Sequence, residues 1–389
     1  MRAPYVHGYL LMLAVLLFSP GCEERKLEKI RIEIENISDR YVPDSRTDIG
    51  AITLRKGGGD TLILKGETTV EGLKNAVIKS LDNKGYTLKD SIILLPDTSL
   101  SKKYFGLATL SVINIRKLPD HSSELVSQSL TGTPLIILKT QDSWALVRTP
   151  DKYIGWTEMS SLRAVTPAQM NEWKNSDRIV FEESTGWIYS NPAETGITSD
   201  VVAGCILSRI GETDTRARVV LPDGREGFVN KSSIIPFNKF RSNKSVTGDD
   251  IVSAASALMG VPYMWGGSSA KGVDCSGLVQ RAFFMNGIIL ARDASQQALH
   301  GDSIPISKDF NGLLPGDLLF FGAPGKISHV AIYKGGLEYI HSSGRVMVNS
   351  LDPSGNNFNS YRKNSLVKAM RILNSIDPGI VAVDKHPLY

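Results

Sequence analysis

Three side chains in the last third of the sequence are of the right types for nucleophilic chemistry: one cysteine and two histidines. Cys275 follows Asp274 where an apolar pattern with helical spacing begins, so Asp274 is expected to cap a helix whose first turn holds the thiol. The unpaired amides and the dipole of a helix start favour a thiolate. A cysteine nucleophile also needs a base, and His329 lies in the strand pattern of residues 327–333. These residues predict covalent catalysis by a thiol and an imidazole.

His341 completes the set if a hairpin brings it to His329. The glycine pair at 335–336 predicts the turn, and the strand that follows carries His341. A two-residue loop would place the two histidines on opposite faces of the hairpin. A three-residue loop with one left-handed glycine would place Tyr333 opposite Leu337 and His341 directly opposite His329. We predict the three-residue loop.

The other cysteines and histidines have no comparable setting. Three cysteines are too few for a disulfide scaffold or for a zinc site made of cysteines alone. Cys205 lies among apolar residues and is predicted to be a core residue. A zinc site built from Cys275, His329 and His341 lacks a fourth ligand, so no metal and no cofactor is expected. The histidines without a predicted role are His7, His121, His300 and His386.

The motifs around these residues, over residues 245–375, resemble the NlpC/P60 family of cysteine peptidases. The resemblance is carried by Asp274-Cys275-Ser276-Gly277, Pro315-Gly316-Asp317-Leu318, Ser328-His329-Val330 and His341. It implies an α+β, papain-like domain, with helices against an antiparallel sheet and the cysteine at the start of a helix. It also implies that Cys275 is the nucleophile, His329 the general base and His341 the residue that orients the base. Tyr263 matches a family tyrosine near the oxyanion position.

Two sections before this domain repeat each other. Residues 144–156 and 216–228 match when one is shifted by 72 positions. The matched pairs are Pro150 with Pro222, Asp151 with Asp223, Gly155 with Gly227 and Trp156 with Phe228. Alternating apolar residues flank the Pro-Asp turn in both copies, so each predicts a β-hairpin. The pattern resembles the bacterial SH3 module, a small barrel, and predicts one copy over residues 101–165 and another over 170–240.

The two copies differ at positions where a ligand could bind. Tyr153 of the first copy corresponds to Arg225 of the second, and residues 123–128 have no clear counterpart in the second. Two such modules before an NlpC/P60 domain resemble the dipeptidyl-peptidase VI type. That type cuts the γ-D-glutamyl–diamino acid bond of cell-wall stem peptides with a free N-terminal L-Ala. The resemblance implies that the first module closes one end of the cleft. The residues that would bind the amine are then Glu124, Tyr153, Asp274, Ser276 and Asp293.

Each of these residues also has a simpler interpretation. Carboxylates and hydroxyls suit a desolvated ammonium. Asp274, however, could be only a helix cap. Asp293 could pair with its neighbour Arg292, and Glu124 could be a solvated surface residue.

Composition excludes several broad classes. The chain has 389 residues with 42% hydrophobic and 22% charged residues, which excludes full-length disorder. Its 44 basic and 40 acidic residues are too balanced to indicate a nucleic-acid partner. Residues 22–100 predict a small α/β section, with a helical apolar face from Leu27 to Tyr41, strands at 61–65 and 91–95, and a helix at 71–81.

The N-terminus predicts export. A short apolar run at 10–18 ends at Ser19-Pro20-Gly21-Cys22, and a polar run follows. This pattern resembles a bacterial lipoprotein signal over residues 1–21, although Ser19 stands where leucine is usual. Cleavage would leave a lipid on Cys22, which would anchor the chain to a membrane facing the periplasm or cell envelope. An ordinary secretory signal with an incidental cysteine is the alternative.

The expected function is hydrolysis of murein stem peptides of the type L-Ala-γ-D-Glu-diamino acid, by a monomer acting in peptidoglycan turnover or recycling. One alternative is a murein endopeptidase that acts on intact wall and uses the SH3 copies as anchors. Another is a wall-binding lipoprotein without activity. The second alternative is disfavoured because Cys275, His329 and His341 are all present.

Overall fold

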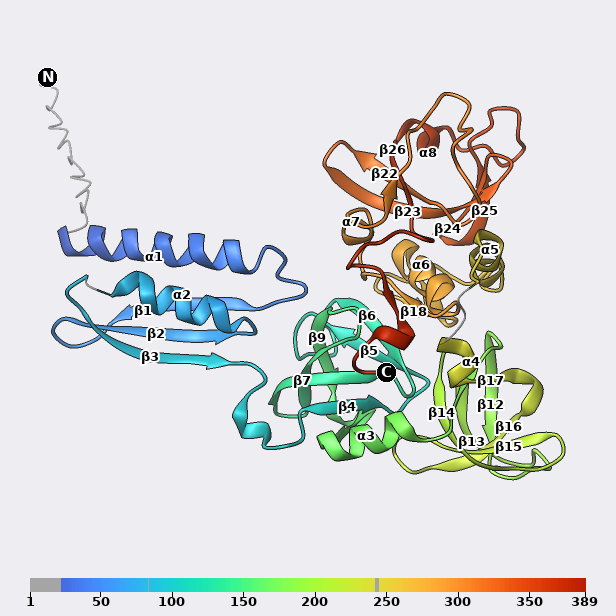
Figure 1. Ribbon diagram of the computed structural model, residues 1–389, viewed down its shortest axis with the longest axis horizontal. Helices are drawn as coiled ribbons and strands as arrows, with labels where there is room; N and C mark the ends of the chain where they lie inside the picture. Colours follow the sequence, from blue (N-terminus) through green and yellow to red (C-terminus); the bar gives the residue numbers. More distant parts are fainter. Residues whose placement is uncertain (1–21, 83, 242–244) are drawn as a thin grey trace, which may run out of the picture. The chain divides into compact units, whose positions relative to one another are not determined.

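The computed structural model describes residues 22–82, 84–241 and 245–389 (Figure 1). The predicted signal peptide therefore lies outside the described residues. Contacts divide the chain into two compact units. Of the described residues, the first unit holds 22–43 and Ile49–Leu94, and the second holds Asp44–Asp48 and Leu95–Tyr389. The short segment between the two parts of the first unit thus belongs to the second.

The first unit is a three-stranded sheet with two helices. Its elements are α1 (Cys22–Tyr41), β1 (Gly50–Lys56), β2 (Thr61–Thr68), α2 (Glu71–Leu81) and β3 (Thr87–Leu94). β2 pairs with β1 in antiparallel and with β3 in parallel orientation, so α2 is the crossover helix. Figure 1 shows both helices on one side of the sheet. The predicted apolar face of α1 is buried in the core from Leu27 to Ile37, whereas Tyr41 is exposed. Strand β1 was not among the predicted elements.

The second unit contains two seven-stranded sheets in succession. The first has the order β10-β4-β7-β8-β9-β5-β6. Its strands are β4 (Phe105–Ala108), β5 (Val112–Arg116), β6 (Leu125–Leu130), β7 (Pro134–Gln141), β8 (Trp144–Arg148), β9 (Ile154–Glu158) and β10 (Leu162–Val165). The second has the order β17-β11-β14-β15-β16-β12-β13. Its strands are β11 (Arg178–Phe181), β12 (Thr185–Tyr189), β13 (Ile197–Val202), β14 (Ile206–Glu212), β15 (Arg216–Val220), β16 (Glu226–Asn230) and β17 (Ile234–Pro236).

The two sheets repeat each other strand for strand. The strand order is the same, and β6, β8 and β9 coincide with β13, β15 and β16 after a shift of 72 positions. Both predicted hairpins are present, as antiparallel β8–β9 and β15–β16. The expectation that residues 123–128 lack a counterpart was wrong. Strand β6 has a structural equivalent in β13, but the side chains of the two strands differ enough to hide the match in the sequence.

The last part of the second unit is a six-stranded antiparallel sheet with helices against it. The sheet order is β21-β26-β22-β23-β24-β25. The strands are β21 (Asp302–Ser303), β22 (Leu318–Ala323), β23 (Lys326–Gly335), β24 (Glu338–Ser343), β25 (Arg345–Ser350) and β26 (Leu366–Arg371). The helices are α5 (Gly248–Ser256), α6 (Cys275–Phe284), α7 (Ala294–Gln297) and α8 (Ser360–Asn364). Leu278 and Phe283 of α6 pack against Val330 and Ile340 of the sheet, which gives the α+β core expected from the sequence.

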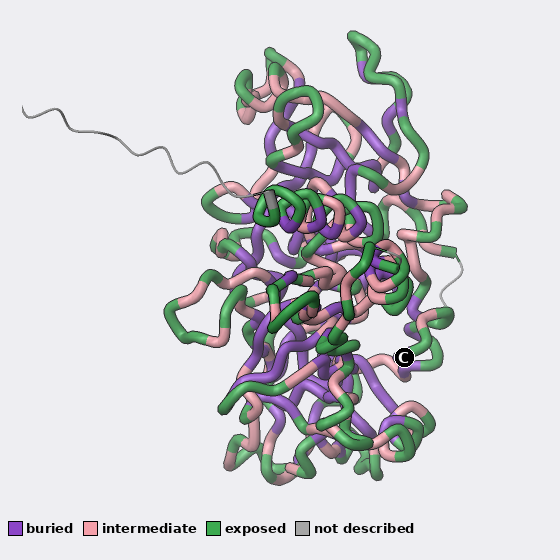
Figure 2. The backbone as a smooth tube through the Cα atoms, turned by 90° about the vertical axis from the view of Figure 1, so that its left-hand side faces the viewer, coloured by how far each residue is buried: buried purple, intermediate pink, exposed green. Residues whose placement is uncertain are grey.

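Short elements connect these parts. They are α3 (Pro167–Asn175), α4 (Phe237–Arg241), the strand pairs β18 (Ser268–Ser269) with β19 (Gly272–Val273) and β20 (Ile288–Ile289) with β27 (Val381–Ala382), and the 3-10 helices η1 (Thr98–Leu100), η2 (Met159–Ser161), η3 (Lys231–Ser233) and η4 (Val383–Lys385). Figure 2 shows buried and exposed stretches alternating along the backbone.

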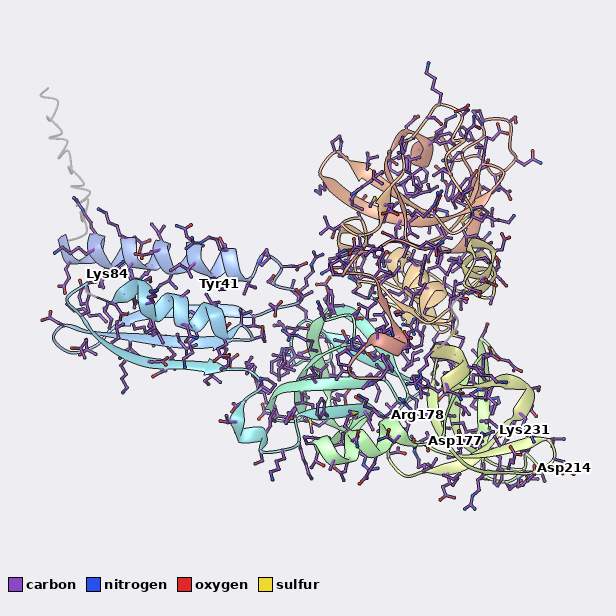
Figure 3. All side chains as sticks on the ribbon, viewed as in Figure 1. Tyr41, Lys84, Asp177, Arg178, Asp214 and Lys231 are labelled. Atoms are coloured by element: carbon purple, nitrogen blue, oxygen red, sulfur yellow. The ribbon has the colours of Figure 1, made fainter. Side chains whose placement is uncertain are left out.

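Tyr389 contacts several parts of the second unit. Arg178, labelled in Figure 3 at the start of β11, is buried and donates a hydrogen bond to the Tyr389 carbonyl at 2.9 Å. Its guanidinium lies 4.0 Å from the centre of the Phe237 ring. Tyr389 in turn packs in one cluster with Leu107 of the first sheet and Phe284 of α6. The seven-stranded sheets and the last domain therefore share a core.

Candidate active site

Cys275 is the first residue of α6, as the capping pattern predicts. Asp274 is the N-cap, and its Oδ1 accepts a hydrogen bond from the Gly277 amide at 2.7 Å. A side chain at position 277 would not fit, because a Cβ there would lie 2.0 Å from the Gly267 carbonyl oxygen. The Asp-Cys-Ser-Gly order thus follows from local packing as well as from chemistry.

Asp274 is more than a cap. Arg292, only 1% exposed at its side chain, donates to Asp274 Oδ2 at 2.6 Å and to Oδ1 at 3.1 Å. Ser276 Oγ and the Gly266 amide donate to the same carboxylate. Both oxygens are therefore already bonded within the protein. The alternative that Arg292 pairs with its neighbour Asp293 was wrong, because Arg292 turns to Asp274 instead.

The two histidines lie on one face of the sheet in direct contact. His329 Nε2 is 2.8 Å from His341 Nδ1. The predicted three-residue loop was wrong in register, since Tyr333 pairs with Tyr339 and the strands close through a bulge to Gly335 and Glu338. His341 therefore lies diagonally from His329 and not directly opposite. A shift of two residues keeps a side chain on the same face, so the contact survives the error in register.

A third residue, which the sequence analysis missed, determines how the protons are placed. Asn349 of β25 donates through Nδ2 to the Asn357 carbonyl at 2.9 Å, which directs its Oδ1 to His341 Nε2 at 2.8 Å. His341 Nε2 must therefore carry a proton, and neutral His341 presents the lone pair of Nδ1. His329 donates its Nε2 proton to that lone pair and keeps Nδ1 as an acceptor. No local motif marks Asn349.

Burial sets the protonation of Cys275, His329 and His341. It raises the pKa of the Cys275 thiol to about 11, with a further contribution from the Asp274 charge and opposition from backbone groups of Val330 and Ser276. Burial also lowers the pKa of His329 to about 2 and that of His341 to about 4. The expected thiolate is thus outweighed by desolvation. The resting site holds a thiol and neutral imidazoles, and His329 is suited to accept a proton during attack.

A cleft of about 680 Å³ opens over Cys275 and brings the remaining predicted residues together. Its lining includes Tyr263, Glu124, Tyr153, Asp274, Ser276 and Asp293. Burial, and then the nearby Cys275, raise the pKa of Tyr263 to about 12, so this phenol remains a hydrogen-bond donor. Residues from the first seven-stranded sheet and from the last domain therefore share one cleft.

Two polar side chains from the loops that lead into β6 and β9 of the first sheet line this cleft. Glu124 accepts a hydrogen bond from Trp265 Nε1 at 2.9 Å and lies 3.5 Å from Lys117 Nζ. Tyr153 is buried, and its hydroxyl donates to Asp293 Oδ2 at 3.4 Å. Burial raises the pKa of Tyr153, so its hydroxyl is neutral.

Asp293 has a partner that no sequence pattern indicates. Arg46 Nη1 donates to Asp293 Oδ2 at 2.8 Å across 247 positions of sequence. Cys205, in contrast, is fully buried in the core of the second seven-stranded sheet, as predicted.

Comparisons with known proteins agree with this arrangement. The profile of the NlpC/P60 family matches residues 260–369, and that of the bacterial dipeptidyl-peptidase Sh3 domain matches residues 115–162. Dipeptidyl-peptidase 6 of Lysinibacillus sphaericus is 32% identical over 252 residues, which cover 61% of this chain and 89% of that protein. The γ-D-glutamyl-L-lysine dipeptidyl-peptidase of Bacillus cereus is 26% identical over 233 residues, which cover 57% of this chain and 68% of that protein.

Solved structures share the fold. An NlpC/P60 family protein from Bacillus cereus superposes with a TM-score of 0.61 at 22% identity, covering 69% of this chain and 99% of that one. An NlpC/P60 endopeptidase from Photobacterium damselae reaches 0.53 at 16% identity, covering 92% of this chain and 93% of that one. The profile match and the relatives lead to one conclusion: this chain belongs to the NlpC/P60 family of peptidases.

Proposed function

We propose that this chain hydrolyses the γ-D-glutamyl–diamino acid bond of murein stem peptides that carry a free N-terminal L-Ala. The observation that carries the proposal is the shared cleft, which Glu124 and Tyr153 line together with Cys275 and Asp293. Carboxylates and a phenol at one end suit an ammonium group, because a desolvated cation needs acceptors around it. The γ-D-glutamyl-L-lysine dipeptidyl-peptidase similar to this chain supports this bond, and dipeptidyl-peptidase 6 supports the same class of enzyme.

The proposed mechanism uses the neutral resting pair. The Cys275 thiol attacks the γ-carbonyl carbon of D-Glu while its proton passes to His329 Nδ1. The His329 imidazolium is stabilised through His341, whose own Nε2 proton is held by Asn349. His329 then protonates the leaving amine of the diamino acid as the C–N bond of the cleaved amide breaks, which leaves the glutamyl group bound to Cys275 as a thioester. Water activated by His329 hydrolyses the thioester and releases L-Ala-γ-D-Glu.

The oxyanion needs donors that are in place before the reaction. The Cys275 backbone amide, at the start of α6, and the Tyr263 hydroxyl are suited to this role. Because the raised pKa of Tyr263 keeps its proton in place, it can donate to a negative oxygen.

A direct comparison of two substrates tests the proposal. Purified protein is given free L-Ala-γ-D-Glu-diamino acid tripeptide or purified sacculi, and products are identified by mass spectrometry. We expect release of L-Ala-γ-D-Glu from the tripeptide and little release from sacculi, where the L-Ala amine is bonded to muramic acid. Efficient cleavage of sacculi, with little cleavage of the tripeptide, would favour a murein endopeptidase acting on intact wall.

We also propose that residues 170–240 form a second SH3 domain. The support is the strand order that it shares with the first sheet after a shift of 72 positions. If this domain binds the wall, substitutions in it that abolish wall binding should lower retention of the protein on sacculi. Turnover of the tripeptide should stay unchanged. Pull-down of the protein by sacculi, compared with turnover of the soluble tripeptide, separates the two.

A further proposal is that the mature chain is a bacterial lipoprotein held at the membrane by a lipid on Cys22. The support is the apolar run that ends at this cysteine in the sequence. Among the residues that the structure describes, no helix is long and apolar enough to cross a membrane. Mass spectrometry of the N-terminal peptide from membrane fractions, for the native chain and for Cys22→Ser, would detect the lipid. An unlipidated N-terminus in the native chain would contradict the proposal.

A further inference from the structure

A five-residue segment far from the catalytic domain in sequence forms part of the cleft. Asp44–Asp48 connects α1 to β1, yet its contacts place it in the second unit. Ser45 lines the cleft that holds Cys275 and Asp293. The segment therefore lies at the end of the cleft where the substrate amine is proposed to bind.

The segment is held on both sides of the cleft. The Arg46 carbonyl accepts a hydrogen bond from the Ile154 amide at 2.8 Å, next to Tyr153 of the first sheet. On the catalytic side, Arg46 Nη1 donates to Asp293 Oδ2 at 2.8 Å and to Ser295 Oγ at 3.0 Å. These contacts join residues from three separate parts of the sequence.

Asp44 holds the Arg46 side chain in a fixed direction. Its Oδ1 and Oδ2 accept from Arg46 Nε and Nη2, both at 2.8 Å, which is the paired geometry that gives arginine–carboxylate contacts their rigidity. Gln296 Nε2 donates to the same carboxylate at 2.8 Å. Hydrogen bonds from Arg46 lower the pKa of Asp44 to about 2, so this carboxylate is charged at neutral pH.

The charges of the three side chains decide what the site can accept. Arg46 alone would cancel the charge of Asp293 and leave nothing for a substrate cation. Asp44 compensates for Arg46, so the set Asp44, Arg46 and Asp293 keeps one net negative charge. A single ammonium group would make the set neutral, which is the favourable condition for a partly buried cluster.

We propose that Arg46 and Asp44 determine the specificity of this enzyme for a substrate with a free amine. Arg46 is a positioning residue that directs Asp293 into the cleft, and Asp44 preserves the negative charge that attracts the ammonium. The inference rests on the proposed function, because it names further residues at the same amine-binding site. It adds a part of the chain outside the two regions that the family profiles match.

The decisive variant is Asp44→Asn, which removes one charge at a residue that need not touch the substrate. We expect KM for the free-amine tripeptide to rise about tenfold, with kcat within about twofold, because only binding of the cation is weakened. The kcat/KM for the N-acetyl tripeptide should stay unchanged. Asp223→Asn is the matched control, since Asp223 accepts from Arg225 Nε at 2.7 Å in a similar Asp-x-Arg contact outside the cleft.

Arg46 is tested by a double-mutant cycle. Arg46→Met should raise KM for the free-amine tripeptide, Arg46→Lys should restore part of the loss, and the effect of Arg46→Met should vanish in the Asp293→Asn background. Equal KM values in all these variants would overturn the inference. A lower KM in Arg46→Met would also overturn it, because Arg46 would then compete with the substrate ammonium.

A binding measurement separates failure of the inference from failure of the proposed function. Calorimetry with Cys275→Ala protein and the dipeptide L-Ala-γ-D-Glu does not depend on turnover. Weaker binding after adding Asp44→Asn supports the inference even if the native protein fails to cleave the tripeptide, whereas unchanged binding overturns it. Thermal unfolding of each variant confirms that the fold is intact.

Discussion

The two seven-stranded sheets share one frame but contact different parts of the molecule. Strand order and spacing coincide after a shift of 72 positions. In the first sheet, Glu124 and Tyr153 line the cleft over Cys275. At the same positions the second sheet has Gly196 and Arg225, and Arg225 donates to the Thr198 and Thr109 carbonyls instead.

This difference shows which of the two sheets has side chains in the cleft. The strands of both copies are determined by the same alternation of apolar residues, which builds the frame and no site. The side chains in the loop before β6 and in the turn before β9 decide whether a copy contributes to the cleft. Four predictions test this contrast, from the largest expected effect to the smallest.

The two buried cysteines should behave in opposite ways. Cys275→Ala should lower tripeptide cleavage by at least about a thousandfold, because it removes the nucleophile. Cys205→Ala should leave kcat nearly unchanged and lower the free energy of unfolding by about 1 kcal/mol, because it only opens space in the second sheet's core. Steady-state kinetics and chemical denaturation measure both. Similar losses of activity in the two variants would contradict the contrast.

Lowering the pH should destabilise the six-stranded sheet that carries His329 and His341 before it destabilises the second seven-stranded sheet. Burial lowers the pKa of His329 to about 2 and of His341 to about 4, whereas an unfolded histidine titrates near about 6.5. Below about pH 6.5 the unfolded state therefore binds more protons than the folded state does. The free energy of unfolding consequently decreases as the pH falls below that value. We expect a loss of about 4–5 kcal/mol, from the two histidines together, between about pH 6.5 and 4.5.

Hydrogen exchange at the two pH values locates this loss. Residues 178–237 contain no histidine, so protection should fall in β23 and β24 more than in β14 and β15. Equal loss of protection in both sheets would show that the histidines do not cause it.

Gly155 and Gly227, which occupy matching positions in the two sheets, should be equally necessary for folding. Only Gly155 should also affect substrate binding. A Cβ at Gly155 would lie 2.5 Å from Ile115 Cγ2, and one at Gly227 would lie 2.5 Å from Ile188 Cγ2 and 2.6 Å from the Tyr189 carbonyl oxygen. Each Gly→Ala variant should lose about 1–3 kcal/mol of stability. Only Gly155→Ala should also raise KM for the tripeptide, because Gly155 lines the cleft. Thermal unfolding and KM are the measurements, and a changed KM in Gly227→Ala would contradict the contrast.

The smallest effects concern the polar side chains themselves. Glu124→Gln should raise KM for the free-amine tripeptide about tenfold, and Tyr153→Phe should raise it about threefold. The effect of Glu124→Gln is limited because the Glu124 side chain is 42% exposed and water screens its charge. The matched variant Arg225→Met should leave KM within about twofold. An unchanged preference between free and N-acetylated tripeptide in Glu124→Gln would remove Glu124 from the amine site.

Local patterns in the sequence predicted the parts that depend on neighbours along the chain. Asp274 caps α6, α2 begins and ends where its pattern does, and both Pro-Asp hairpins form. The shared face of His329 and His341 was also predictable, because side chains alternate along strands. Their register was not, since a bulge and three consecutive left-handed residues at Gly335, Gly336 and Leu337 tighten the turn.

The amino-acid sequence by itself predicted the candidate catalytic residues, the repeat and the family, because each depends on residue types at short or repeated spacing. Only the tertiary structure decided which side chains pair with one another around the candidate site. Arg292 bonds Asp274, Asn349 orders the protons of His341, and Arg46 reaches Asp293. Such partners meet through the packing of whole elements, so no local pattern records them. The same packing buries Cys275, and desolvation there outweighs the helix start that the sequence displays.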